Sequence, residues 1–177
     1  MTDCEFCAII GGDFESEEIY QDEKVVAVLH LKPAAPGHVL LFTKEHFPII
    51  EQVPDFIVGH AFTVANKLST AIFESLGVQG TNIIIENGTA AGQSIAHFSV
   101  HIIPRNENDG LKLDWQPAKP GKEEMEIAHY QIKEQADTIH PSGFEKEKVV
   151  VEEPVEEKKE EKHGEHAHLL KQVTRIP

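Results

Sequence analysis

The chain has 177 residues, 40% of them apolar, and its 16 basic and 30 acidic side chains give a net charge of −14. This length suits one globular domain with an appendage, and the apolar content excludes global disorder. The acidity argues against non-specific binding to nucleic acid or anionic membranes, and no apolar run approaches the ~20 residues of a membrane span. The first residues lack the features of a signal peptide, so we expect a soluble cytoplasmic protein.

Four short apolar runs predict β-strands, and one long amphipathic segment predicts a helix. The strands are Val25–Leu29, His38–Thr43, Thr81–Ile85 and Phe98–Ile103, the last of which is stopped by Pro104. The helix follows Pro54 and ends at Gly77, with apolar positions recurring every three or four residues at Ile57, Ala61, Val64, Leu68, Ile72 and Leu76. Two strands, a helix and two more strands with short connections indicate an α+β fold with an antiparallel sheet.

The composition changes near residue 143. Residues 143–166 hold nine Glu and five Lys but one aromatic residue, so this segment reads as a linker or a solvated helix. The last residues, Leu169–Pro177, regain apolar side chains and are either a docking peptide or a frayed terminus. We therefore divide the chain into a domain at 1–142 and a charged linker and C-terminal tail at 143–177.

A C-x-x-C pair, Cys4 and Cys7, stands at the start of the chain. Two thiolates at this spacing can hold one tetrahedral zinc ion, which then needs two more nitrogen or sulfur ligands. The chain has no third cysteine, so the candidates are histidines: His46 after the second strand and His97 at the head of the last. A redox pair and two inert buried thiols are the alternatives, although no βαβ context accompanies the motif.

The most informative segment is AGQSIAHFSVHIIPR, residues 91–105. Side chains alternate between the two faces of a strand, so His97, Ser99 and His101 share one face, while Phe98 and its alternate neighbours share the other. One face is therefore expected to line a site and the other to join the core. The preceding Gly-Gln-Ser loop offers backbone N–H groups and a hydroxyl, which suit phosphate.

The segment resembles the signature of the histidine triad (HIT) family, in which three histidines alternate with apolar residues after such a loop. The resemblance extends to HLKPAAPGHVLLFTKEH (30–46), NGTAAGQS (87–94) and LKLDWQP (111–117), and so to about Cys4–Ile139. It implies an α+β fold with a five-stranded antiparallel sheet, one long helix and a C-terminal helix. It also implies a homodimer and the hydrolysis or transfer of nucleoside monophosphates through a nucleotidyl-histidine intermediate.

The resemblance also implies roles for particular residues. Zinc-binding members of the family carry ligands at positions that match Cys4, Cys7, His46 and His97, which implies a structural zinc. Gln93 and Ser94 match positions of the phosphate loop. His101 matches the third triad histidine, and His38 matches a histidine that supports the triad from behind.

Three positions depart from the family pattern. Ser99 stands where the family has its nucleophilic histidine, and a serine hydroxyl without a base is a poor nucleophile. His30 stands where the family has an Asp or Asn for the ribose hydroxyls. Glu86 stands where the family has an Asn or Gln that donates to phosphate, and an ionised carboxylate cannot donate. Ser99 with His101 is one candidate dyad.

These departures leave three readings of function. The preferred one is a nucleotide-binding protein of this family with a degenerate catalytic pocket and weak or no nucleotidyl hydrolase activity. The first alternative is an active nucleoside phosphoramidate or dinucleoside polyphosphate hydrolase. The second is a structural dimer whose acidic tail binds a partner.

Overall fold

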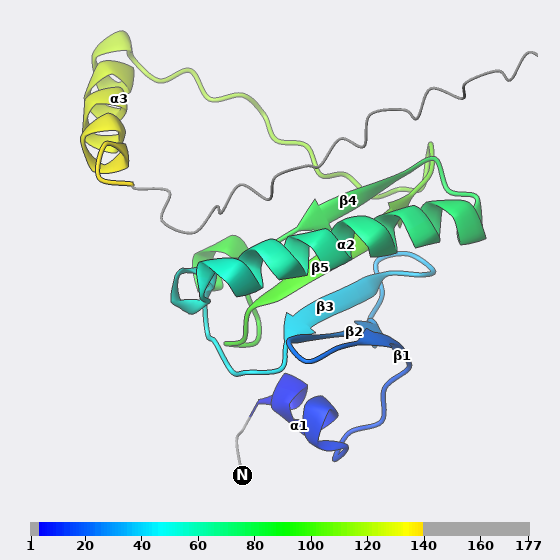
Figure 1. Cartoon of the computed structure of the whole chain (residues 1–177). Helices are drawn as coiled ribbons and strands as arrows, with labels where there is room; N and C mark the ends of the chain where they lie inside the picture. Colours follow the sequence, from blue (N-terminus) through cyan, green and yellow to red (C-terminus); the bar gives the residue numbers. More distant parts are fainter. Residues whose placement is uncertain (1–3, 140–177) are drawn as a thin grey trace, which may run out of the picture. The chain divides into compact units, whose positions relative to one another are not determined.

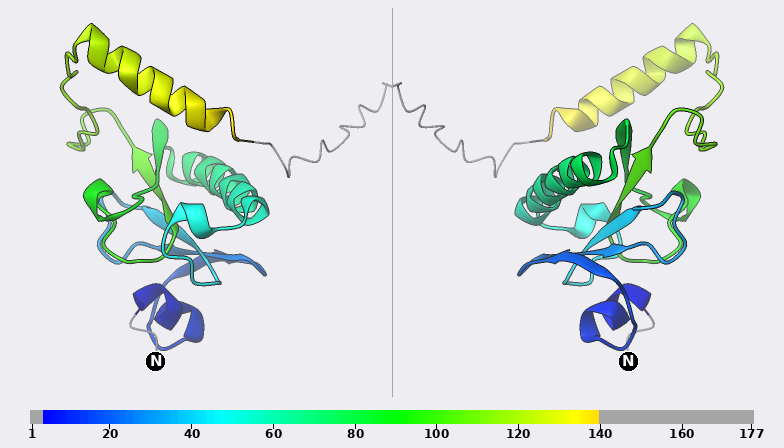
Figure 2. Two further views of the ribbon diagram at one scale, coloured as in Figure 1. Left: turned by 90° about the vertical axis from the view of Figure 1, so that its left-hand side faces the viewer. Right: turned by 90° about the vertical axis from the view of Figure 1, so that its right-hand side faces the viewer.

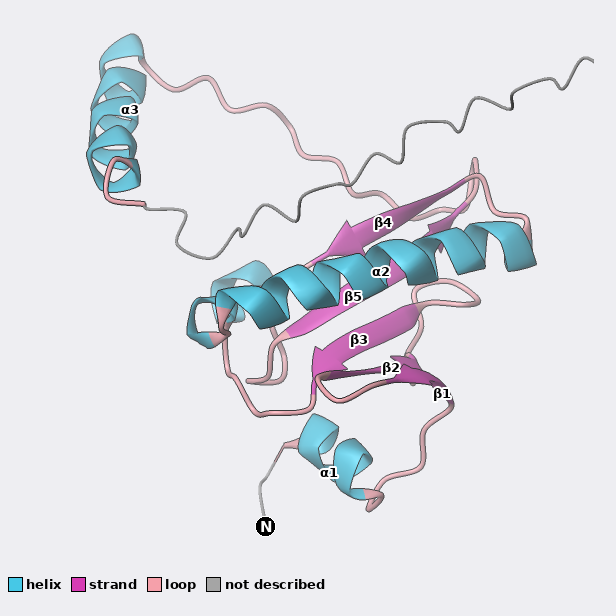
Figure 3. Ribbon diagram, in the orientation of Figure 1, coloured by secondary structure: helices cyan, strands magenta, loops and turns pink. Residues whose placement is uncertain are grey.

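The computed structural model, which describes residues 4–139, joins the predicted strands into one antiparallel sheet (Figures 1 and 3). The strands are β1 (Glu18–Gln21), β2 (Val25–Leu29), β3 (Val39–Thr43), β4 (Gly80–Ile84) and β5 (Ser99–Arg105). The helices are α1 (Glu5–Gly11), α2 (Asp55–Leu76) and α3 (Lys122–Ala136), with 3₁₀ turns η1 (Ile50–Gln52) and η2 (Thr89–Ala91).

The strand order β1-β2-β3-β5-β4 places the histidine-bearing β5 inside the sheet. Helix α2 carries the chain from β3 to β4, and β5 then returns between them. His101 lies opposite Leu40 on β3 and opposite Ile84 on β4, so its position is fixed from both sides. The polar positions of β5 are therefore held on rigid backbone.

The two faces of the sheet are covered by different helices (Figure 2). Alternate residues of β2 and β3, such as Val25 and Leu41, pack with the apolar face of α2, and Phe98, Val100 and Ile102 join them. The intervening residues, such as Val28 and Phe42, pack with α1. The ring of Phe6 in α1 stacks on Phe42 with 4.7 Å between centroids. The face that carries α1 is also the face of Ser99 and His101.

The fold class and the pattern of faces around β5 are confirmed, but several details of the predicted elements are wrong. Strand β5 begins at Ser99 and continues through Pro104 to Arg105. It pairs with β3 only as far as Ile102, so the missing N–H of Pro104 costs no bond to β3. Leu76 does not join the core, since it lies in the last turn of α2 and is 52% exposed.

Helix α2 is long and apolar enough to cross a membrane by length and composition alone. However, its Ile57, Ala61, Val64, Ala65, Leu68 and Ile72 are buried in the core against the sheet. This is the behaviour of a core helix.

Helix α3 forms where the family resemblance implies a C-terminal helix, and none of its residues is buried. Apolar side chains such as Met125, Ile127 and Tyr130 are all more than half exposed. The predicted linker and tail at 143–177 lie outside the described residues, so the division of the chain at this point stays a prediction.

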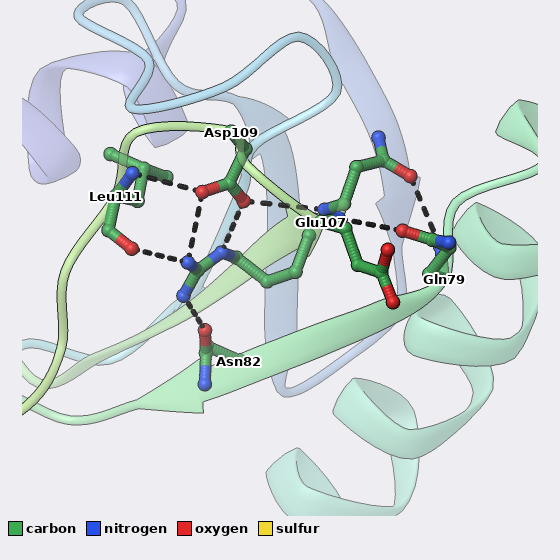
Figure 4. A network of polar contacts seen from close by, with 7 residues as sticks. Gln79, Asn82, Glu107, Asp109 and Leu111 are labelled. Atoms are coloured by element: carbon green, nitrogen blue, oxygen red, sulfur yellow. Dashed lines mark hydrogen bonds and ion pairs between the residues drawn. The ribbon is translucent and has the colours of Figure 1, made fainter.

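Arg105 connects the end of β5 to its surroundings through Asn82, Asp109 and Leu111, which are labelled in Figure 4. Its guanidinium donates to both carboxylate oxygens of Asp109 (2.6 and 3.0 Å), to the Leu111 carbonyl and to Asn82 on β4. The Asp109 carboxylate also accepts from the amide N–H groups of Asn106 and Leu111. Arg105 therefore fixes the turn that follows β5 rather than an external anion.

Candidate functional site

Cys4, Cys7, His46 and His97 come together at one end of the sheet, with their candidate ligand atoms all within 4.8 Å of one another. Cys4 caps the N-terminus of α1, and Cys7 follows one turn later. The sulfur of Cys4 lies 3.4 Å from Nδ1 of His97, and the sulfur of Cys7 lies 3.3 Å from Nδ1 of His46. The four side chains predicted from the spacing thus form one cluster that could hold a metal ion.

The orientation of His97 suits a metal ligand. Its Nε2–H donates to the Thr43 carbonyl oxygen at 2.8 Å, so the lone pair of the neutral ring is on Nδ1, which faces the sulfurs. A second ring nitrogen bonded to a backbone carbonyl is the usual arrangement for a metal-bound histidine. His97 is fully buried, and burial lowers its pKa, which keeps the ring neutral at pH 7. The donor set of two thiols and two imidazoles matches closed tetrahedral sites.

Beside this cluster lies a cavity of about 360 Å³ on the same face of the sheet. Its walls come from α1, from the strand ends around β2 and β5, and from the loop before β5. Six predicted site residues line it: His30, Glu86, Gln93, Ser94, Ser99 and His101. Phe6 lines the cavity as well, and its ring lies 5.6 Å from that of His97. Helix α1 is thus shared by the metal cluster and the pocket.

A second histidine cluster supports the pocket wall: His30, His38 and His101. The amide N–H of Ala34 donates to Nδ1 of His38 (3.1 Å), so a neutral His38 carries its proton on Nε2. That Nε2–H donates to Nδ1 of His101 (3.1 Å), which leaves the His101 proton on Nε2. His38 therefore fixes the tautomer of His101.

His30 is held in the same tautomer by a different amide. The N–H of Lys32 donates to Nδ1 of His30 at 2.9 Å, so the proton of the neutral ring is again on Nε2. Burial lowers the pKa of His30 and of His101, even though the nearby Glu86 carboxylate raises both. Burial, with the neighbouring rings, lowers the pKa of His38 to about 4. All three rings are therefore neutral at pH 7.

The remaining predicted residues have distinct surroundings. The side-chain amide of Gln93 is hydrogen-bonded within the protein. Its oxygen accepts from the Gly88 N–H, and its nitrogen donates to the carbonyls of Pro48 and Ile95. The sequence pattern did not reveal this loop-fixing role. The Ser99 hydroxyl forms no hydrogen bond within residues 4–139, and His101 Nδ1 is already bonded to His38. The proposed Ser99–His101 dyad is therefore not formed in this arrangement.

The structure is thus an α+β domain in which a Cys₂His₂ cluster that could hold a metal ion lies beside a histidine-lined pocket. Residues 12–108 match the model of the HIT domain, and the chain belongs to the HIT family. An adenylylsulfatase of Arabidopsis thaliana is 38% identical over 111 residues, which are 63% of this chain and 56% of that protein.

Two solved structures extend the comparison to the fold. A zinc-bound histidine triad family protein from Mycobacterium smegmatis is 29% identical with a TM-score of 0.60, over 77% of this chain and 98% of that one. A histidine triad nucleotide-binding protein from Candida albicans is 26% identical with a TM-score of 0.69, over 78% of this chain and all of that one.

The Cys₂His₂ cluster predicts a tightly bound metal. Elemental analysis of the purified protein should find about one ion per chain, and a chelator should lower its melting temperature, because metal binding contributes to folding. Cys4→Ser should lose the ion, whereas His129→Gln, which alters an exposed histidine on α3, should keep it. The expectation would be contradicted if the wild-type protein contained no metal and a chelator left its melting temperature unchanged.

The buried position of His38 predicts an unusual titration. Its pKa of about 4 lies below the ordinary value of 6.5, so the unfolded chain binds more protons between these pH values. This contribution to stability is complete above pH 6.5 and is lost as the pH falls towards 4. Proton NMR of the His38 ring should show no titration between pH 8 and 5. Titration near pH 6.5 would mean that the ring is solvated.

Proposed function

We propose that this chain is a nucleotide-binding HIT protein whose pocket has little or no nucleotidyl hydrolase activity. The observation that carries the proposal is Ser99, which lines the cavity at the position of the family's nucleophile. Its hydroxyl forms no hydrogen bond to a base within residues 4–139, and its oxygen is closer to the backbone than an imidazole nitrogen would be. A hydroxyl of this kind does not attack phosphorus readily at pH 7.

The size of the pocket and the relatives support nucleotide binding. A cavity of about 360 Å³ falls within the range of small-molecule sites, roughly 300–1,000 Å³. One relative is named as an adenylylsulfatase and one as a nucleotide-binding protein, so an adenosine-containing ligand is the first choice. An active hydrolase of phosphoramidates or dinucleoside polyphosphates is the alternative, and it requires a nucleophile other than a histidine at position 99.

We also propose that Cys4, Cys7, His46 and His97 hold a structural zinc ion. The tautomer of His97 and the presence of zinc in the Mycobacterium smegmatis relative support this assignment. A closed set of four protein ligands would leave no open position for substrate. The ion would attach α1 to the sheet and take no part in a reaction. The cytoplasmic location stays a prediction from the sequence.

Turnover of adenosine 5′-phosphoramidate tests the catalytic part of the proposal. Typical enzymes reach a kcat/KM of about 10⁴–10⁸ M⁻¹ s⁻¹, and we expect the wild-type protein to lie at least a hundredfold below this range. Ser99→His, measured in parallel, should turn over faster to the extent that the rest of the site is intact. An ordinary enzymatic rate in the wild-type protein would establish the active hydrolase instead.

We propose a homodimer formed through the β4 edge of the sheet. Within the sheet formed by the described residues, β4 has a neighbouring strand on one side only, and Ile83 on this strand is 41% exposed. Phe73 and Leu76 on α2, the helix that packs against β4, are each 52% exposed. A free strand edge beside an apolar helix surface favours pairing with a second chain. A role as a structural dimer that recruits a partner through its tail remains the second alternative.

Light scattering during size-exclusion chromatography tests the dimer. The wild-type protein should have about twice the mass of one chain, and Phe73→Glu should give a single chain, because a buried charge at the interface is costly. Phe56→Glu is the matched control, since Phe56 is 66% exposed but lies under Lys24 near the start of α2. A monomeric wild-type protein would contradict the proposal.

A further inference from the structure

The pocket contains a half-buried carboxylate with no positive partner. Glu86 lines the cavity, and it forms no ion pair or hydrogen bond within residues 4–139. The backbone at Gly92 lies close to the Glu86 side chain, since a Cβ added to Gly92 would be 3.2 Å from the carboxylate. The other charged side chains in the lining, Glu5 and Lys32, are both exposed at the rim. The interior of the pocket is therefore negative.

The three neighbouring histidines do not make this a metal site. A metal ion binds a ring nitrogen through its lone pair. In His30 and His38 that lone pair is on Nδ1, where it accepts a backbone N–H, and in His101 it accepts from His38. This is the opposite of His97, whose N–H is bonded to a carbonyl and whose lone pair faces the two sulfurs. The pocket histidines present N–H donors.

The loop before β5 offers a phosphate few free donors, chiefly the amide N–H and the hydroxyl of Ser94. The amide N–H groups of Ala91, Gly92 and Gln93 donate to carbonyls within the loop itself. The side-chain amide of Gln93 is engaged as well. The His30 and His101 rings are neutral and can donate one hydrogen bond each, but they stand close to the negative Glu86. A dianion would meet this charge, and the only cation in the lining is the exposed Lys32.

We propose that the pocket binds a ligand that presents a primary ammonium group to Glu86 and an oxygen acceptor to the Nε2–H groups of His30 and His101. The Ser99 hydroxyl, which has no partner of its own in the described chain, supplies a further acceptor for the ammonium. This inference rests on the proposed nucleotide-binding function, of which it keeps the nucleoside part, and it names the class of ligand that the same site prefers. The ligand that the site prefers is an aminated nucleoside, and a nucleoside monophosphate binds more weakly.

A matched set of three probes tests the inference: 5′-amino-5′-deoxyadenosine, adenosine 5′-monophosphate and adenosine. They share the same base and ribose and differ only in the 5′ substituent, which is an ammonium, a phosphate or a hydroxyl group. Calorimetry on the full-length wild-type protein should show the amine bound about 10- to 100-fold more tightly than the monophosphate, the range expected for one hydrogen-bonded charge. Adenosine should bind with an intermediate affinity.

Two variants separate Glu86 from the general acidity of the chain. Glu86→Gln should remove the preference for the amine and tighten the monophosphate. Glu107→Gln removes an equal charge from the exposed turn after β5, and it should keep the wild-type order of affinities (Figure 4).

Three outcomes overturn the inference. Tighter binding of the monophosphate to the wild-type protein, unchanged in Glu86→Gln, would refute it and leave the proposed nucleotide-binding function in place. No binding of any of the three probes would refute the proposed function, and the inference with it. A second tightly bound zinc ion per chain, lost in His30→Gln, would show that the assigned tautomers are wrong.

Discussion

The hydrogen bond from Nε2–H of His97 to the carbonyl of Thr43 is the contact on which the two sites depend. It sets the ring of a fully buried histidine so that Nδ1 faces both cysteines of α1. Helix α1 has only seven residues, too short to be stable in isolation, so it relies on such attachments. Its Phe6 then packs on Phe42 and completes a wall of the pocket.

Histidine offers a lone pair in one cluster and N–H donors in the other. Which of the two it offers depends on the backbone group that is hydrogen-bonded to the ring. Where a carbonyl oxygen meets the ring, as at His97, a lone pair is left for a metal. Where an amide N–H meets the ring, as at His38 and His30, an N–H is left for a ligand or for the next ring. Five histidines on one face of the sheet can therefore form two sites with little competition for the same ion.

Sequence alone predicted the parts of the site that depend on periodicity and spacing. The alternation around Ser99 placed Phe98 in the core and His101 on the other face, because a central strand allows only two directions. The gathering of Cys4, Cys7, His46 and His97 followed from the ligand chemistry of zinc. The sequence pattern does not predict strand β1, because all four of its side chains are exposed and no buried face marks it as a strand.

Other features depend on contacts between distant segments and could not be predicted. Gln93 stands in a loop typical of phosphate binding, yet its amide is bonded to Pro48, which is 45 residues away in the chain. The tautomers of His30 and His38 depend on the turn of residues 32–34 rather than on residue type. Leu76 has the correct helical spacing, but the core ends before the last turn of α2.

The match to the HIT domain begins at residue 12, whereas α1 occupies Glu5–Gly11. The segment that closes the pocket therefore lies outside the portion by which the family is recognised. A protein trimmed to the matched residues would keep the whole sheet and α2 but would lose Cys4, Phe6 and Cys7. Without α1, one wall of the pocket would be absent. Ligand affinities measured on such a trimmed domain would therefore describe a different site from that of the full chain.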